Sequence, residues 1–134
     1  MALQWTPDLS VGNRHIDEQH QELIRRFNDL LEACRTGRGR SEVSRLCEFL
    51  DDYVVSHFSQ EEELMTLHDY PDREEHFAQH RYFTQKLKDL KNSLATDGAN
   101  TPLVITTNKT LLDWILRHIK QVDVRLGAYL RVAV

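Results

Sequence analysis

Apolar residues recur along this chain every three or four positions, which is the spacing of helices that bury one face. In the first such stretch the apolar positions are Ile16, Leu23, Phe27, Leu30 and Cys34, and His20 falls on the same face. Comparable stripes follow in three later stretches, each longer than a typical strand. The pattern therefore predicts helices over about 13–35, 41–67, 72–96 and 102–126.

Short polar connections that contain glycine or proline separate the predicted helices. We expect Ser41, Asp72 and Thr101 to cap the second, third and fourth helices. Short connections place consecutive amphipathic helices side by side and antiparallel. The sequence thus predicts an all-α protein, an antiparallel up-down four-helix bundle, as one domain over 1–134. Residues 1–12 are expected to form an N-terminal arm that lies on the bundle.

Composition narrows the classes of protein that this chain can represent. It has 134 residues with 17 basic and 21 acidic side chains, a formal charge of -4. One domain of this length can bury a core, and the acidic balance argues against nucleic acid as a partner. No run of about 18 apolar residues occurs, so we predict no membrane insertion. The first residues lack the basic and apolar regions of a secretory signal, which predicts a cytoplasmic protein.

Histidines interrupt the apolar stripes of all four predicted helices. Burying one unpaired imidazole costs about a few kcal/mol, and a core of this size could hardly absorb several such costs. Metal binding explains the whole set at once. Five of the seven histidines lie on core faces: His20, His57, His76, His80 and His118.

Two carboxylates belong with these imidazoles. Glu61 follows His57 by four positions on the same stripe, and Asp123 lies near the end of the fourth helix. Glu62 and Glu63 fall off the stripe and are expected to be solvated. Five imidazoles and two carboxylates exceed the needs of one tetrahedral zinc. They suit a pair of six-coordinate metals of the iron type.

The complete set resembles the ligand signature of the hemerythrin family over about 11–126. The matching motifs are His20, His57-x-x-x-Glu61, His76-x-x-x-His80 and His118-x-x-x-x-Asp123. The resemblance implies two non-haem iron ions, one held by the last three histidines and the other by the first two. It also implies that both carboxylates and an oxo or hydroxo group bridge the irons. One position on the iron with two histidines stays open for dioxygen as ligand.

The same resemblance implies an oxygen pocket lined by Leu23, Phe58, Trp114, Ile115 and Ile119. An apolar pocket offers no general acid or base to cleave the O–O bond. We therefore predict reversible dioxygen binding for oxygen storage, delivery or scavenging, with no catalytic residues and no enzymatic activity. A redox or oxygen-consuming partner is expected beside dioxygen.

Two other functions fit the same ligands. One is an oxygen or redox sensory module of a signalling protein, and the other is a di-iron enzyme acting on peroxide or nitric oxide. The sequence departs from the family's pattern at Leu126, where relatives often carry an aromatic residue.

The spacing of His118 and Asp123 conflicts with a regular helix. At about 100° per residue, positions five apart differ by about 140° and would not face the same metals. Either the fourth helix departs from regular geometry, by widening into a π-type turn between them or by rotating and beginning to end there, or the aspartate side chain bends around a regular helix. The backbone hydrogen bonds of the fourth helix distinguish the two.

Overall fold

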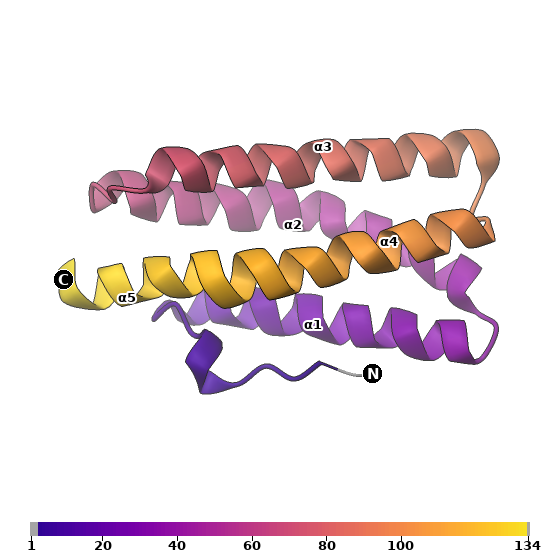
Figure 1. The fold of residues 1–134 in the computed structure, drawn as a ribbon, viewed down its shortest axis with the longest axis horizontal. Coiled ribbons are helices and arrows are strands. Elements are labelled where there is room, and N and C mark those ends of the chain that lie inside the picture. Colours follow the sequence, from indigo (N-terminus) through magenta and orange to yellow (C-terminus); the bar gives the residue numbers. More distant parts are fainter. Residues whose placement is uncertain (1–2, 134) are drawn as a thin grey trace.

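The computed structural model describes residues 3–133, so the first two residues of the predicted arm lie outside the described part. Four antiparallel rods form the predicted all-α up-down bundle (Figure 1). The first three rods are α1 (Arg14–Arg35), α2 (Gly39–Leu67) and α3 (Arg73–Asp97). The fourth is a continuous run of α4 (Thr101–Asp113), the π-helical segment η2 (Trp114–Asp123) and α5 (Val124–Ala133). The fold-class prediction is confirmed.

The helix starts differ from the predicted caps. The second helix begins at Gly39, and the Ser41 hydroxyl donates to the carbonyl of Arg38 instead of capping the helix. Asn100 caps α4 through its side chain, while Thr101 is already helical. Asp72 occupies the cap position of α3 but makes no capping hydrogen bond through its side chain. The predicted caps at Ser41 and Thr101 were therefore wrong, each because the helix begins earlier.

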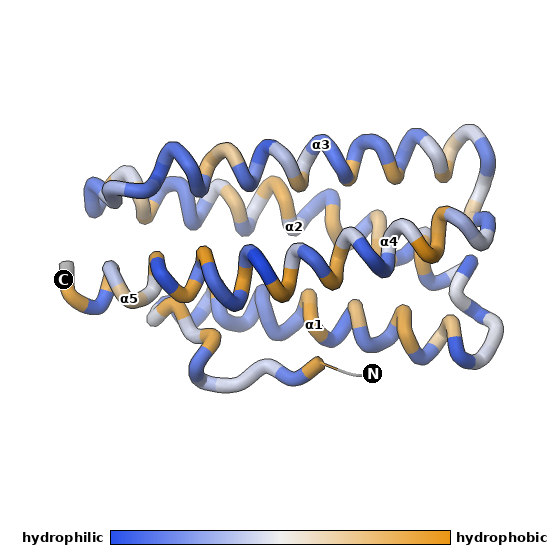
Figure 2. Tube along the Cα trace, viewed as in Figure 1, coloured by the Kyte–Doolittle hydropathy of each residue, from blue (hydrophilic) through white to orange (hydrophobic). Residues whose placement is uncertain are grey.

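Apolar residues return at intervals along each rod, as Figure 2 shows. They meet in one main core that runs between the rods, with Leu23, Phe27 and Leu46 among its buried members. The predicted burial of Cys34 was wrong, because this thiol is exposed and Ala33 takes the inward position. Among residues 3–133, no helix combines the length and apolar character needed to cross a membrane.

A second, smaller core explains why the fourth rod continues to Ala133, beyond the predicted end at 126. Leu126 and Leu130 are buried against Met65 and Tyr70, so the apolar stripe continues one further turn. Leu126, the departure from the family's pattern, is fully buried in this cluster.

The arm crosses the fourth rod at a glycine. A Cβ atom built on Gly127 would lie 2.6 Å from the Cα atom of Val11, which is closer than real contacts allow. Val11 is fully buried there. Farther back, the Asn28 side chain both accepts from and donates to the backbone of Leu3. The described part of the arm, η1 (Pro7–Leu9) included, is thus held on the bundle at two points.

Candidate metal centre

Seven side chains from all four rods converge at the centre of the bundle, and each is at most 2% exposed. They form two overlapping groups, and within each group the potential ligand atoms lie within 4.8 Å of one another. One group is Glu61, His76, His80, His118 and Asp123, and the other is His20, His57, Glu61 and Asp123. The structure thus brings together every side chain that the sequence nominated as a ligand. His15 and His68 lie outside both groups.

The fourth rod widens where His118 and Asp123 must share a face. All ten residues of η2 are π-helical, and this segment contains both side chains. A π-helix bonds residues five apart and has a wider turn than an α-helix, so positions five apart come much closer to the same face. The Nε2 atom of His118 consequently lies 3.0 Å from Oδ1 of Asp123. Of the two explanations that the spacing left open, the structure has the widened turn.

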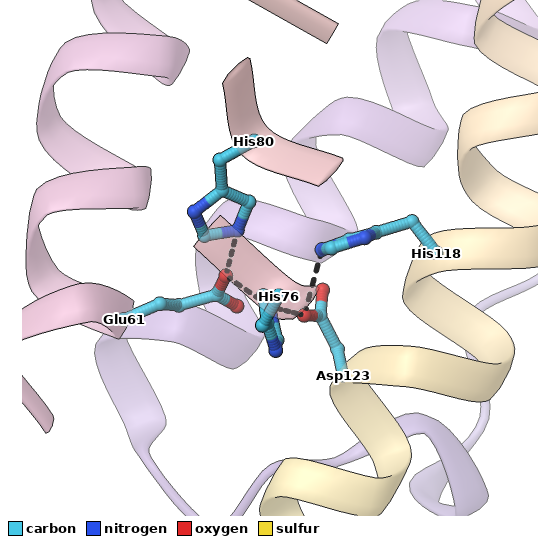
Figure 3. A group of neighbouring side chains, drawn as sticks. All are labelled: Glu61, His76, His80, His118 and Asp123. Atoms are coloured by element: carbon cyan, nitrogen blue, oxygen red, sulfur yellow. Dashed lines mark hydrogen bonds and ion pairs between the residues drawn. The ribbon is translucent and has the colours of Figure 1, made fainter. Parts of the chain in front are cut away.

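Each bridging candidate directs one oxygen at each group. Oε1 of Glu61 lies 3.0 Å from Nε2 of His80, while Oε2 lies 3.1 Å from Nε2 of His57. In the same way, Oδ1 of Asp123 is 3.0 Å from the His118 nitrogen, and Oδ2 is 3.1 Å from that of His20. Figure 3 shows the rings of His80 and His118 directed at the two carboxylates, with His76 between them. The two groups therefore differ in their histidines and share both carboxylates.

Two glutamines that the sequence analysis did not consider orient the imidazoles. Gln19 accepts from Nδ1 of His57 at 2.6 Å, and Gln79 accepts from Nδ1 of His118 at 2.7 Å. Each glutamine reaches from one helix to a histidine on the next. A repeated dipeptide in the sequence marks them, because Gln19 and Gln79 each immediately precede a histidine of the cluster.

Glu62 orients a third ring. Its carboxylate lies 2.8 Å from Nδ1 of His80, and its side chain is 40% exposed. The expectation that Glu62 is merely solvated was therefore wrong. A proton on Nδ1 leaves Nε2 as the free lone pair, which is the tautomer that a metal-binding imidazole needs.

The buried atoms of the cluster fit metal ions. With Nδ1 donating outward, the Nε2 lone pairs of His57 and His118 face carboxylate oxygens at about 3 Å. Such opposed lone pairs repel unless a cation lies between them. Among the described residues, these two nitrogens and both oxygens of Asp123 have no hydrogen-bond partner despite full burial. Buried polar atoms are rarely left unsatisfied, so their convergence in the two groups indicates a site that can hold cations.

The pKa values show how strongly the cluster attracts positive charge. Burial favours the neutral form of Asp123, as does the charge of Glu61, yet His118 and His20 outweigh both and lower the pKa of this carboxyl. Burial lowers the pKa of His76, but Asp123 and Glu61 outweigh it and raise that pKa to about 9. Protons and metal ions compete for the same atoms, so metal binding must release protons here.

Aromatic rings cover two histidines of the larger group. The Phe58 ring stacks on His80 with centroids 3.9 Å apart, and Trp114 stacks on His118 at 3.8 Å. These two members of the predicted oxygen pocket therefore pack on the side with three histidines. The aliphatic members are fully buried: Leu23, Ile115 and Ile119.

A tyrosine that the sequence analysis left out of the pocket covers the smaller group. Tyr53 stacks on His57 with centroids 4.6 Å apart, and its hydroxyl accepts from the indole N–H of Trp114 at 3.3 Å. Burial raises the pKa of Tyr53 well above its usual value, so the phenol stays neutral. The position one turn before a ligand histidine was the signal that could have found it.

Comparisons with known proteins agree with this geometry. The family model described as hemerythrin HHE cation binding domain matches residues 11–130. The bacteriohemerythrin of Methylococcus capsulatus is 32% identical over 129 residues, which cover 95% of this chain and 96% of that protein. The bacteriohemerythrin of Stenotrophomonas maltophilia is 30% identical over 121 residues, covering 90% and 76%. A hemerythrin-like protein of Naegleria gruberi is 31% identical over 121 residues, covering 90% and 87%.

Proposed function

Because this chain belongs to the hemerythrin family, we propose that it binds dioxygen reversibly at a centre of two non-haem irons. One observation carries the proposal: two groups of ligand atoms share Glu61 and Asp123, and each carboxylate directs one oxygen at each group. A carboxylate placed in this way can bridge two metals. Histidine-rich ligation with bridging carboxylates suits iron of borderline hardness.

The proposed ligand assignment follows the two groups. His76, His80 and His118 hold one iron, and His20 and His57 hold the other. An oxo or hydroxo group is the third bridge. The unequal number of imidazoles leaves the open coordination position on the iron with two histidines. Dioxygen is the proposed ligand at this position.

The aliphatic residues of the predicted oxygen pocket support binding rather than catalysis. When bound, two ferrous ions would supply the two electrons that dioxygen takes up. Leu23, Ile115 and Ile119 are fully buried and carry no acid or base, so they keep water out and provide no proton for O–O cleavage. Storage, delivery or scavenging of oxygen is therefore the proposed role.

Metal analysis and one spectroscopic cycle test this function. Protein produced with iron should contain close to two irons per chain. The reduced protein should gain a charge-transfer spectrum in air and lose it under argon. One tightly held zinc, with no iron uptake after reconstitution, contradicts the di-iron centre. Immediate and irreversible oxidation in air contradicts reversible binding and favours a sensor or an enzyme.

A further inference from the structure

A groove of about 1020 Å³ runs between α3 and the fourth rod. Three small side chains line it, namely Ala78 on α3 and Thr106 and Thr110 on α4. Its lining includes three buried rings, those of Phe83, Trp114 and His118. We call this hollow the α3–η2 groove.

The α3–η2 groove is basic in an acidic protein. Two carboxylates, Glu75 and Asp113, also line it. Among the described residues none of the groove's cations forms an ion pair, so their charge is available to a partner. Three of the cations follow one another along a rod at intervals of eight residues, a row roughly 20 Å long. The four cations are Lys86, Lys109, Arg117 and Arg125.

The floor of the groove leads directly to the metal centre. His118 lines the groove, while its Nε2 atom faces Asp123 inside the cluster. The ring of Trp114 lies flat on this imidazole at 3.8 Å. A molecule seated in the groove is therefore separated from the proposed iron by one aromatic ligand.

A smaller groove of about 380 Å³ also reaches a ligand, His80, on the other side of α3. The carboxylate of Glu62 lines it and bonds to that imidazole, and Arg81 and Lys88 also line it. This groove therefore has two cations against one carboxylate, whereas the α3–η2 groove has four against two. The α3–η2 groove is the larger of the two and has the greater net positive charge, which favours it for an acidic partner.

We propose that the α3–η2 groove docks an acidic one-electron carrier protein, which delivers electrons to the metal centre through His118. The inference rests on the proposed di-iron centre. Each reduced carrier loses one electron and one ferric ion gains it, so two encounters return both irons to the ferrous state, and no bond is made or broken. A row of roughly 20 Å exceeds the span of one mononucleotide and suits the small, weak interface of electron-transfer proteins. Opposite charge steers such encounters.

Docking is measured first, without any need for oxygen binding. Oxidised flavodoxin, a small acidic carrier, is labelled with ¹⁵N and titrated with the unlabelled protein. The charge-reversed double variant Lys86→Glu/Lys109→Glu should weaken binding by about tenfold or more at low salt. The control Lys88→Glu/Lys120→Glu changes net charge equally on the same two rods but outside the α3–η2 groove, and should weaken binding by less than about threefold. Because Lys88 lines the smaller groove, this control also reports docking there. An equal or larger loss in the control, or no binding by the unaltered protein, overturns the proposal.

Electron delivery is measured second, as the rate at which reduced flavodoxin reduces the oxidised protein. The rate should fall with rising salt and should drop by about tenfold in the groove variant alone. Reduction by the cationic radical of methyl viologen should not slow in either variant. If free flavin mononucleotide binds as tightly as flavodoxin, the groove binds a small anion and the proposed docking of a protein is wrong. If the protein docks flavodoxin but does not bind oxygen reversibly, this inference stands and the proposed function fails.

Discussion

The surface of α1 and the surface of the fourth rod carry their cations in opposite ways. Every arginine of α1 pairs with a carboxylate on its own helix, for example Arg14 with Glu18. In the fourth rod Lys109, Arg117 and Arg125 have no such partner among the described residues. Pairs at this spacing cancel the charge of a helix surface and contribute little stability. The first surface is neutralised within itself, and the second keeps a charge that another molecule can neutralise.

The histidines in the interior also differ between these two sides of the bundle. His20 and His57 are completely buried behind α1 and α2, where large side chains such as Phe27 and Leu46 fill the space between the rods. His118 instead lines the α3–η2 groove. The imidazoles of His20 and His57 are thus fully covered by protein, whereas the other ligand group has an imidazole on a groove wall. This division suits the proposed binding of a gas on one side and the proposed exchange of electrons on the other.

The largest effect on iron content should come from changing a carboxylate that both ligand groups share. Asp123→Asn replaces a charged oxygen donor by a neutral amide in both ligand groups, so most of the iron should be lost. Helix content measured by circular dichroism should stay close to that of the unaltered protein. The control is Glu63→Gln on the exposed face of α2, which should retain its iron. Full iron retention by Asp123→Asn contradicts a bridging role.

The metal-free protein should lose stability in alkaline solution. The pKa of His76 is raised to about 9, so the native state holds a proton there that the unfolded chain releases above about 6.5. The resulting stabilisation is present below pH 6.5 and disappears as the pH rises to 9, a loss of about 3 kcal/mol. Denaturant unfolding of metal-free protein across this range measures it. The iron-loaded protein should show a much flatter profile, since a metal replaces the proton, and identical profiles would contradict metal binding at His76.

Truncating a buried side chain of the predicted oxygen pocket should lower the stability of the protein and also reduce the protection of ferrous iron from water. Leu23 is fully buried, so Leu23→Ala should lower the free energy of unfolding by about 3 kcal/mol and speed oxidation of the ferrous protein by admitting water. Thr110→Ala on the groove is the matched change, with an expected cost below about 1 kcal/mol. An unchanged oxidation rate in Leu23→Ala places this side chain away from the oxygen site.

The smallest effect should come from the two orienting glutamines. Gln19→Ala and Gln79→Ala each remove the acceptor for one Nδ1–H, and loss of such a partner weakens metal affinity by about tenfold or more. Gln79 lines the α3–η2 groove of about 1020 Å³, whereas Gln19 lines a smaller groove of about 270 Å³, so water can replace the amide oxygen of Gln79 more readily. Competition with a chelator should therefore show a smaller loss for Gln79→Ala than for Gln19→Ala. The reverse order would contradict the difference in water access between the two grooves.

The bundle and the nominated ligands could be predicted because both depend on local spacing. A stripe with the helical period must face a core, and a histidine on that stripe is carried inward with it, as His57 and Glu61 are on α2. The helix starts were less predictable, since the turn before Gly39 closes through backbone hydrogen bonds and the helix begins there without a side-chain cap. The spacing of His118 and Asp123 narrowed the backbone to two forms without deciding between them.

Contacts between the rods decided the features of the site that local spacing could not predict. Gln19 and Gln79 act on histidines of the neighbouring helix, and Glu62 reaches His80 in the same way, so their roles depend on how the rods are aligned. Helix period determines which face a side chain occupies but carries no information about what stands opposite. By itself the sequence determined which residues enter the core and what chemistry they bring. The tertiary structure alone decided which carboxylate oxygen faces which histidine and which side of the centre lies open, because these follow from packing across residues far apart in the chain.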